Sequence, residues 1–243
     1  MTVPWSRFVA LGDSLTEGIG DPTRAGLLGW ADRLVAHLRA SHPNLQYWNL
    51  ARRSLTTREA RDQQLDRALE LNPDLASVAV GMNDILGPDF DMEIYRDDLA
   101  SIVKPLRDSG ATVLTGTFPA TLPALRLMPR DKARKYRSRL HQASVAVRRV
   151  ADAHGALCMD APDGWRYTMS ECSIDGCHPN ARGHVHIAQL ALDALSREAG
   201  IDPAHIGRDG CRWVSTSARH LRWLTTQGYL HKAPAWARRM SRA

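Results

Sequence analysis

The stretch Phe8-Val9-Ala10-Leu11-Gly12-Asp13-Ser14-Leu15 decides the fold, because it joins an apolar run to a polar loop. Four apolar residues in a row, ended by glycine and aspartate, are typical of a strand that is covered on both faces. Strands of that kind belong mostly to parallel sheets with helices on both sides. The stretch therefore predicts an α/β domain whose first strand delivers Ser14 to an edge of the sheet.

The rest of the chain alternates strand-like and helix-like segments. Short apolar runs bounded by glycine, proline, asparagine or aspartate predict four more strands, at Leu45–Leu50, Leu75–Val80, Ala111–Leu114 and Ala156–Met159. Apolar residues at helical spacing predict the helices, at Leu27–Leu38, after the capping box of Thr56 and Glu59, at Leu99–Leu106, from about Asp131 to His154, and after Pro179. This order is typical of a three-layer α/β/α sandwich built on a parallel sheet.

The composition fits one globular domain with a short appendage. Of the 243 residues, 44% are hydrophobic and 24% charged, a mixture usual for proteins that bury a sizeable core. The four cysteines form no C-x-x-C pair, so we expect free thiols in a reducing compartment. The first apolar run, Phe8–Leu11, is too short for a secretion signal or a membrane span. These features predict a cytoplasmic protein.

The net charge of +6 belongs to the C-terminal tail. Residues 205–243 carry eight lysines and arginines and one aspartate, so residues 1–204 have a net charge of −1. This change of composition predicts a domain over residues 1–204 and a basic, tryptophan-containing helical extension over residues 205–243. Because the domain itself is not basic, we expect no nucleic-acid partner.

Polar clusters stand where the predicted strands end. Ser14 follows the first strand, Ser54 the second and Asn83 the third. Asp175 and His178 precede the last helix. The loops after parallel strands share one edge of the sheet, where such folds bind their ligands. We therefore expect these side chains to converge, although they come from distant parts of the chain.

These residue types suit nucleophilic catalysis by a serine. A serine hydroxyl attacks a carbonyl carbon efficiently when a base takes its proton, and the neutral imidazole of His178 suits that role. An acidic residue must orient the imidazole, and Asp175 lies three positions before it. The oxyanion that forms needs hydrogen-bond donors. The candidates are the backbone N–H groups of Ser14 and Ser54 and the side-chain amide of Asn83.

In this pattern the chain resembles the SGNH hydrolases, also called GDSL esterases/lipases, over roughly residues 5 to 200. The family's four blocks occur in order, as Gly12-Asp13-Ser14-Leu15, Asn49 to Ser54, Gly81-x-Asn83-Asp84 and Asp175-x-x-His178. One short motif is weak, whereas four in order at the expected places are specific. The resemblance implies a flavodoxin-like fold with a five-stranded parallel sheet, and hydrolysis of esters or thioesters without metal or cofactor. It also implies Ser14 as nucleophile, His178 as base and Asp175 as acid.

Ser54 departs from the family's pattern, which usually has glycine in this block. Serine has the same backbone N–H as glycine and can donate the same hydrogen bond, but serine tolerates a positive φ poorly. The Ser54 side chain could also crowd the acyl group and favour small ones. After the fourth strand, Phe118–Leu125 could line an acyl or alcohol pocket or form a proline-stiffened surface connection, and both interpretations stay open.

The remaining polar residues near the motifs receive structural interpretations. Asp13 and Asp84 are expected to shape the loops. His184 and His186 do not complete a zinc-type ligand set with His178. Cys177 is adjacent to His178 and so cannot readily aim its thiol at the same point. No phosphate-loop or dinucleotide-binding glycine motif is present in the sequence.

We expect a monomer or weak dimer that cleaves a small-molecule carboxylic ester through an acyl-enzyme on Ser14. An acyltransferase, a thioesterase or a lysophospholipase would use the same residues. A non-catalytic binding domain is a third hypothesis, against which the intact set of catalytic residue types speaks.

The tail allows three interpretations. Its aromatic residues alternate with arginines, and further residues recur at helical spacing around Pro234. The aromatic residues are Trp213, Trp223, Tyr229 and Trp236, and the helical spacing links Ala233, Trp236, Ala237 and Met240. A basic helix of this kind can lie on an anionic membrane surface. It can equally cover the active site as a lid, or dock on the domain and expose its arginines to water, which is the interpretation that we favour.

Overall fold

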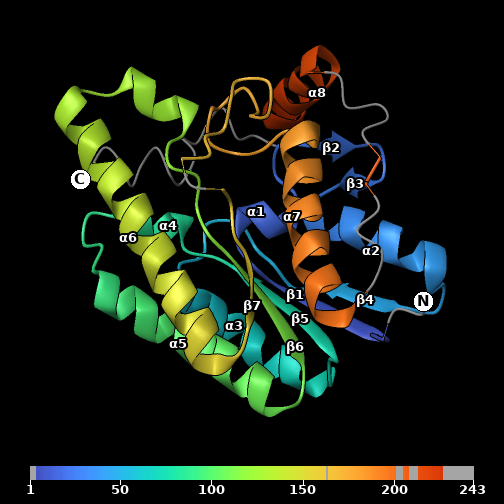
Figure 1. The fold of residues 1–243 in the computed structure, drawn as a ribbon. Coiled ribbons are helices and arrows are strands. Elements are labelled where there is room, and N and C mark those ends of the chain that lie inside the picture. The colour runs from blue at the N-terminus through green and yellow to red at the C-terminus, as the bar shows by residue number, and fades with distance from the viewer. Residues whose placement is uncertain (1–3, 163, 201–204, 208–212, 227–243) are drawn as a thin grey trace.

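A computed structural model describes residues 4–162, 164–200, 205–207 and 213–226, and contains a parallel sheet of five strands (Figure 1). The strands lie in the order β4-β1-β5-β6-β7. Their bounds are Arg7–Gly12 for β1, Gln46–Asn49 for β4, Leu75–Ala79 for β5, Thr112–Gly116 for β6 and Leu157–Met159 for β7. All five match the predicted strands, and the order is that of flavodoxin-like folds. The predicted fold class is confirmed.

Helices cover both faces of the sheet. On one face, α2 (Trp30–Ser41) packs against α7 (Ala181–Ala199). On the other face, α5 (Met92–Asp108) lies between α3 (Thr57–Glu70) and α6 (Arg130–His154). The inner strand β1, which lies between β4 and β5, is apolar and buried from Phe8 to Leu11, as a strand covered by two helical layers requires. The sheet is therefore a rigid base from which the loops at its C-terminal edge project.

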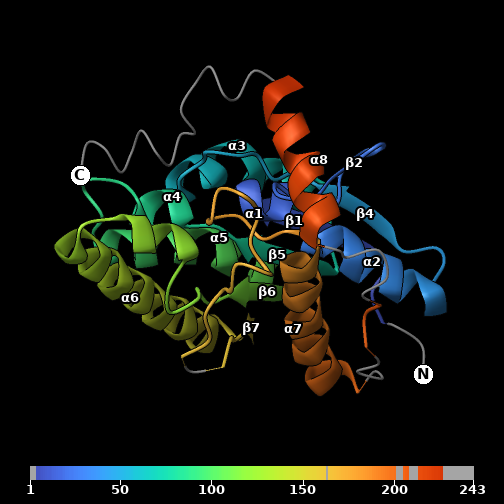
Figure 2. The same ribbon diagram turned by 90° about the horizontal axis from the view of Figure 1, so that it is seen from above.

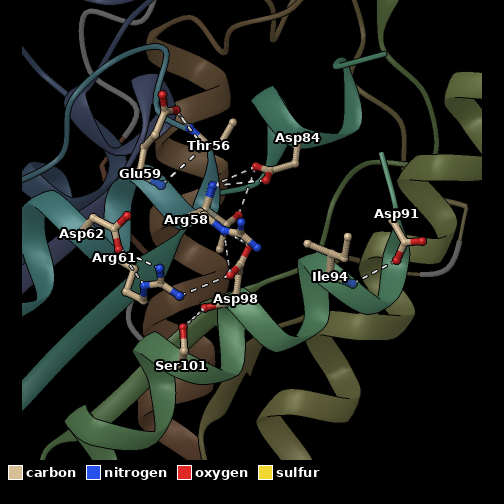
Figure 3. Close-up of polar contacts among 11 residues, drawn as sticks. Thr56, Arg58, Glu59, Arg61, Asp62, Asp84, Asp91, Ile94, Asp98 and Ser101 are labelled. Atoms are coloured by element: carbon tan, nitrogen blue, oxygen red, sulfur yellow. Dashed lines mark hydrogen bonds and ion pairs between the residues drawn. The ribbon is translucent and has the colours of Figure 1, made fainter. Parts of the chain in front are cut away.

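The start of α3 is held firmly beside α5, as Figure 3 shows. Thr56 and Glu59 form the predicted capping box, in which the Glu59 carboxylate accepts the Thr56 backbone N–H at 2.7 Å. Arg58 and Arg61 both contact the nearly buried carboxylate of Asp98 on α5. Because the loop before α3 carries Ser54, these contacts anchor one side of the candidate site.

Several short elements were not predicted from the sequence. They are α1 (Ser14–Glu17), α4 (Met82–Ile85), the 3-10 helix η1 (Pro123–Leu127), and the hairpin of β2 (Pro22–Thr23) and β3 (Gly26–Leu27). The first predicted helix was expected to begin at Leu27, which was wrong, since this residue pairs with Pro22 in the hairpin and the helix, α2, begins at Trp30. Elements of two to five residues are too short to show a helical or strand period.

The described part of the tail forms a helix that docks on the domain. This helix, α8 (Trp213–Thr226), contacts α7 and β2 and stands over the C-terminal edge of the sheet (Figure 2). The Arg219 guanidinium lies 3.3 Å from the buried carboxylate of Asp21. The predicted helical segment around Pro234 lies outside the described residues, and the domain boundary at residue 204 stays a prediction. None of the described helices is both long and apolar enough to cross a membrane.

Candidate active site

Ser14 begins α1, and Asp13 alone separates it from the end of the inner strand β1. Asp13 is the N-cap of this short helix, and its carboxylate accepts a hydrogen bond from the Leu15 backbone N–H at 3.0 Å. The half-buried Ser14 side chain therefore stands at the C-terminal edge of the sheet, at the place where the sequence predicted it.

His178 lies against Ser14 although 164 positions separate them. The imidazole Nε2 is 2.9 Å from Ser14 Oγ, and Nδ1 is 2.6 Å from Oδ2 of Asp175. The other carboxylate oxygen of Asp175 accepts the backbone N–H groups of Cys177 and His178, at 2.9 and 3.0 Å. The serine, the imidazole and the carboxylate thus form one continuous chain of hydrogen bonds.

Close packing of the two loops depends on Gly20. Its φ is 109°, and a Cβ atom at this position would lie 1.8 Å from the carbonyl oxygen of Pro179. A side chain here would push the loop of His178 away from the loop of Ser14. The Gly18-x-Gly20 spacing, which has no third glycine for a dinucleotide motif, therefore has a packing role.

The charged forms of Asp175 and His178 stabilise each other. Burial alone would raise the pKa of Asp175, but the charge of His178 and hydrogen bonds from His178 and Cys177 lower it to about 2. Burial alone would lower the pKa of His178, but the Asp175 carboxylate raises it above the ordinary value. Asp175 is consequently ionised at neutral pH, as a group that orients an imidazole and stabilises an imidazolium must be.

The two other predicted oxyanion donors lie on adjoining loops. Asn83 is in α4, and its side-chain amide donates to the carbonyl oxygen of Leu55 at 2.9 Å. Ser54 directly precedes Leu55 and has a φ of 70°, in the region that favours glycine. The position therefore requires a positive φ, and serine adopts it at a cost of about 1–2 kcal/mol.

Two buried carboxylates tie these loops together. The Asp13 carboxylate also lies close to the backbone N–H groups of Gly81 and Met82 at the start of α4, which act to lower its pKa. Asp84 accepts the backbone N–H and the hydroxyl of Thr57 at the start of α3, at 3.0 and 3.1 Å. Burial raises the pKa of both carboxyls to about 6. Their contacts give both residues the loop-shaping role predicted for them.

A comparison with protein families shows to which family the chain belongs. A model of the GDSL-like lipase/acylhydrolase family matches residues 10–185, which include all four polar clusters. The chain belongs to this family. No curated protein matches the chain.

Solved structures of hydrolases share the fold of this GDSL-like chain. The enzyme LAE5 from the metagenome of Lake Arreo, Spain, described as an alpha/beta hydrolase, is 25% identical with a TM-score of 0.65, over 81% of this chain and 97% of its own. The acetylxylan esterase Axe2 of Geobacillus stearothermophilus is 19% identical with a TM-score of 0.63, over 82% and 96%. The psychrotrophic esterase EstA of Pseudoalteromonas sp. is 19% identical with a TM-score of 0.60, over 81% and 100%. At 19% identity the last two show the shared fold alone.

An apolar cavity of about 70 Å³ opens beside Ser14 and His178 in this GDSL-like chain. Its walls come from the ends of β5, β6 and β7, from the loops that follow them, and from α7. Among its lining residues are Met82, Phe118, Pro119, Met159, Ala161, Trp165, Tyr167, Ile187 and Leu190. Of the predicted Phe118–Leu125 segment only Phe118 and Pro119 line the cavity, and the rest continues into η1. Ser54 does not line it, so the cavity gives no support to crowding of the acyl group by Ser54.

The structure adds positioning residues that the sequence did not reveal. The buried side chain of Gln64 on α3 accepts the Gly12 backbone N–H and donates to the Gly12 carbonyl oxygen, both at 2.9 Å. The Arg53 guanidinium and backbone N–H both bind the Glu17 carboxylate. Gln64 falls on the face of α3 that carries Ala60 and Ala68, and this spacing could have marked it as a buried polar residue.

The other predicted structural residues behave as ordinary parts of the fold. The buried His184 contacts the carbonyl oxygen of Ile19 at 3.1 Å, and burial lowers its pKa to about 3. His186 bonds Glu171, and the residues described here contain no cluster of three metal-binding side chains. Burial raises the pKa of the Cys177 thiol, which disfavours the thiolate that a cysteine nucleophile needs.

Proposed function

We propose that this GDSL-family chain is a serine esterase that cleaves carboxylic esters through an acyl-enzyme on Ser14. The observation that supports it best is the continuous contact from Ser14 Oγ through the imidazole of His178 to the carboxylate of Asp175. A hydroxyl, a base and an orienting acid at these distances are the requirements for acyl transfer to a serine.

The reaction would proceed in two halves that use the same imidazole. Ser14 Oγ attacks the ester carbonyl carbon while Nε2 of His178 takes the hydroxyl proton. The C–O bond to the alcohol then breaks, and the departing oxygen receives this proton from His178. In the second half a water molecule attacks the acyl carbon and gives a proton to His178, and the released Ser14 oxygen takes it back. Asp175 stabilises the imidazolium in both halves.

The oxyanion would be bound by the backbone N–H groups of Ser14 and Ser54 and by the side-chain amide of Asn83. The adjoining positions of Asn83 and the Ser54 loop support this role. Removal of one such donor typically raises the barrier by about 3–4 kcal/mol. Asn83→Leu is therefore expected to lower kcat by roughly 10²–10³-fold.

We propose further that the apolar cavity holds the acyl group of the substrate. It adjoins both Ser14 and His178 and is walled mostly by apolar side chains, so it favours a small to medium hydrocarbon chain. Axe2 is an acetylxylan esterase, and acetylated sugars are the alternative substrate to test. A thioesterase, a lysophospholipase or an acyltransferase would use the same residues, and product analysis with an added alcohol separates hydrolysis from transfer.

A fluorophosphonate probe tests the proposal directly, because it labels serines that are activated as nucleophiles. We expect the full chain to be labelled and to hydrolyse p-nitrophenyl butyrate, and Ser14→Ala to lose the label and about 10⁴-fold or more of kcat. Ser54→Ala is a matched control that should keep the label. A folded Ser14→Ala variant that turns over the ester at the parental rate would refute the proposal. The predicted cytoplasmic location, small-molecule partner and monomeric or weakly dimeric state stay predictions.

A further inference from the structure

Helix α8 touches three of the loops that build the candidate active site. Arg219 contacts Asp21 in the loop that follows Ser14. Trp223 lies under the guanidinium of Arg53, which precedes Ser54. His220 reaches the loop that carries the proposed acid and base. Figure 2 shows the helix standing over this edge of the sheet.

His220 makes a specific contact with the loop that carries Asp175 and His178, which we call the acid–base loop. His220 is completely buried, and its Nδ1 atom is hydrogen-bonded to the hydroxyl of the buried Ser173. The Ser173 backbone N–H donates to the His178 carbonyl oxygen at 2.8 Å, and the Ser173 carbonyl oxygen accepts the Gly176 N–H at 3.0 Å. Ser173 therefore closes the turn that presents Asp175 and His178, and His220 holds Ser173.

Burial keeps this histidine uncharged. It lowers the pKa of His220 to about 4, so the imidazole is neutral at the pH where the proposed esterase needs a neutral His178. The hydrogen bond to Ser173 consequently does not depend on the ionisation of His220 in the working range. A buried polar side chain that bonds one specific hydroxyl costs free energy if that bond is lost, so it fixes the orientation of α8.

Trp223 connects α8 to a second loop of the site, the one that carries Arg53 and Ser54, which we call the oxyanion loop. The Arg53 guanidinium lies 5.0 Å from the centre of the indole ring, a distance typical of a cation–π contact. The same guanidinium binds Glu17, at the end of the helix that Ser14 begins. The indole therefore supports the arginine that joins the loops of Ser14 and Ser54.

We propose that His220 and Trp223 are positioning residues for ester hydrolysis, through which α8 fixes the acid–base loop relative to the oxyanion loop. This inference rests on the proposed function. His220 acts on His178 through Ser173, and Trp223 acts on Ser54 through Arg53. The tail is then part of the working enzyme, although it lies outside the region that the family model matches.

Each link makes a different kinetic prediction. His220→Ala loosens the turn of Asp175 and His178, and we expect kcat to fall roughly 10- to 100-fold, because small misplacements of catalytic groups have effects of this size. The midpoint of the acid limb of kcat/KM should also move down toward about 6.5, the ordinary pKa of histidine. Trp223→Leu should also lower kcat but should not move that midpoint down, because it acts through Arg53, whose charge lowers the pKa of His178.

Conservative and matched variants separate positioning from general stability. His220→Asn places an amide near the position of Nδ1 and should restore kcat to within about threefold, and Trp223→Phe should restore most of the cation–π contact. The exposed neighbours on α8 provide controls, since Leu221→Ala and Arg222→Ala should match the parent. Circular dichroism and thermal unfolding verify that each full-length variant is folded.

A folded His220→Ala variant with parental kcat and parental midpoint overturns the proposal. The proposal is also overturned if the midpoint of His220→Ala stays parental and its kcat falls only in proportion to the fraction of folded protein. Titration of the His178 ring by NMR measures the same midpoint without turnover, so it tests the link even if the full chain hydrolyses no ester. Failure of the proposed function is recognised separately, by absence of fluorophosphonate labelling in the parent.

Discussion

The Gln64 side chain binds both polar backbone atoms of Gly12, two residues before the proposed nucleophile. Its amide oxygen accepts the Gly12 N–H and its amide nitrogen donates to the Gly12 carbonyl oxygen, each at 2.9 Å. Gly12 ends the inner strand β1, and both Gly12 and Gln64 are buried away from water. A side chain on α3, the helix predicted after the capping box of Thr56 and Glu59, thus fixes the point at which β1 ends and the Ser14 loop begins.

Replacement of Gln64 should affect stability and activity together. Gln64→Met keeps the volume but removes both hydrogen bonds, and a buried polar group without its partner costs about 1–3 kcal/mol. We expect urea unfolding to show a loss of that size and kcat to fall while KM changes little. Gln63→Met changes the same residue type at the exposed neighbouring position, so it should leave both quantities at parental values. Equal behaviour of the two variants would contradict the role of Gln64.

Ser54 is expected to be less stable than glycine at its position. A φ of 70° is strained for serine, and glycine adopts it freely at the expense of a more flexible unfolded chain. Ser54→Gly should therefore raise the free energy of unfolding by about 0.5–1 kcal/mol.

The same variant tests where the acyl group lies. Because Ser54 does not line the apolar cavity, the ratio of rates on acetyl and octanoyl esters should stay at the parental value in Ser54→Gly. Ser54→Val, with a β-branched side chain at positive φ, should instead lose stability. If Ser54→Gly raises the rate on octanoyl esters alone, the acyl group binds on the Ser54 side of the site and not in the cavity.

Much of this site could be predicted from the sequence, because it depends on residues that lie close together in the chain or at the ends of predicted strands. The strand before Ser14 is an uninterrupted apolar run, and the rules of parallel sheets place the loops after β1, β4 and β5 at one edge. Asp175 and His178 are three residues apart, so their contact follows from a single turn. The capping box of Thr56 and Glu59 likewise lies within four residues.

The contacts that could not be predicted join residues that no local pattern relates. His220 meets Ser173 across 47 positions, and Gln64 meets Gly12 across 52. Such pairs depend on how helices settle on the finished sheet, and packing of this kind leaves little trace in residue spacing. The hairpin and the helices α1 and α4 were missed for a different reason, because two to four residues carry no period.

The activity should depend on pH through His178. Catalysis needs the neutral imidazole, and the Asp175 carboxylate raises the pKa of His178 above its ordinary value. The rate kcat/KM should therefore rise with pH and reach half its plateau above about 6.5. Asp175→Asn removes the charge that raises this pKa, so the midpoint should move to lower pH while the plateau falls by roughly 10³–10⁴-fold.

Initial rates on p-nitrophenyl butyrate from about pH 5 to about pH 9 measure both effects, because histidines titrate within this range. Asp160→Asn is a suitable control, because this partly exposed carboxylate pairs with Arg148. A midpoint that Asp175→Asn leaves in place would show that the carboxylate does not set the pKa of His178.

The apolar cavity should set the preferred length of the acyl chain. Each methylene that leaves water for an apolar wall contributes about 0.8 kcal/mol, or about fourfold in kcat/KM, so rates should climb from acetyl through butyryl esters and fall once the chain exceeds the cavity. Ala161→Leu adds side-chain volume at its wall and should move the optimum to shorter chains, whereas Ile187→Ala enlarges it and should move the optimum to longer ones. Ala199→Leu, at the far end of α7, should leave the profile unchanged. If the two cavity variants shift the optimum in the same direction, or not at all, the acyl group does not occupy this cavity.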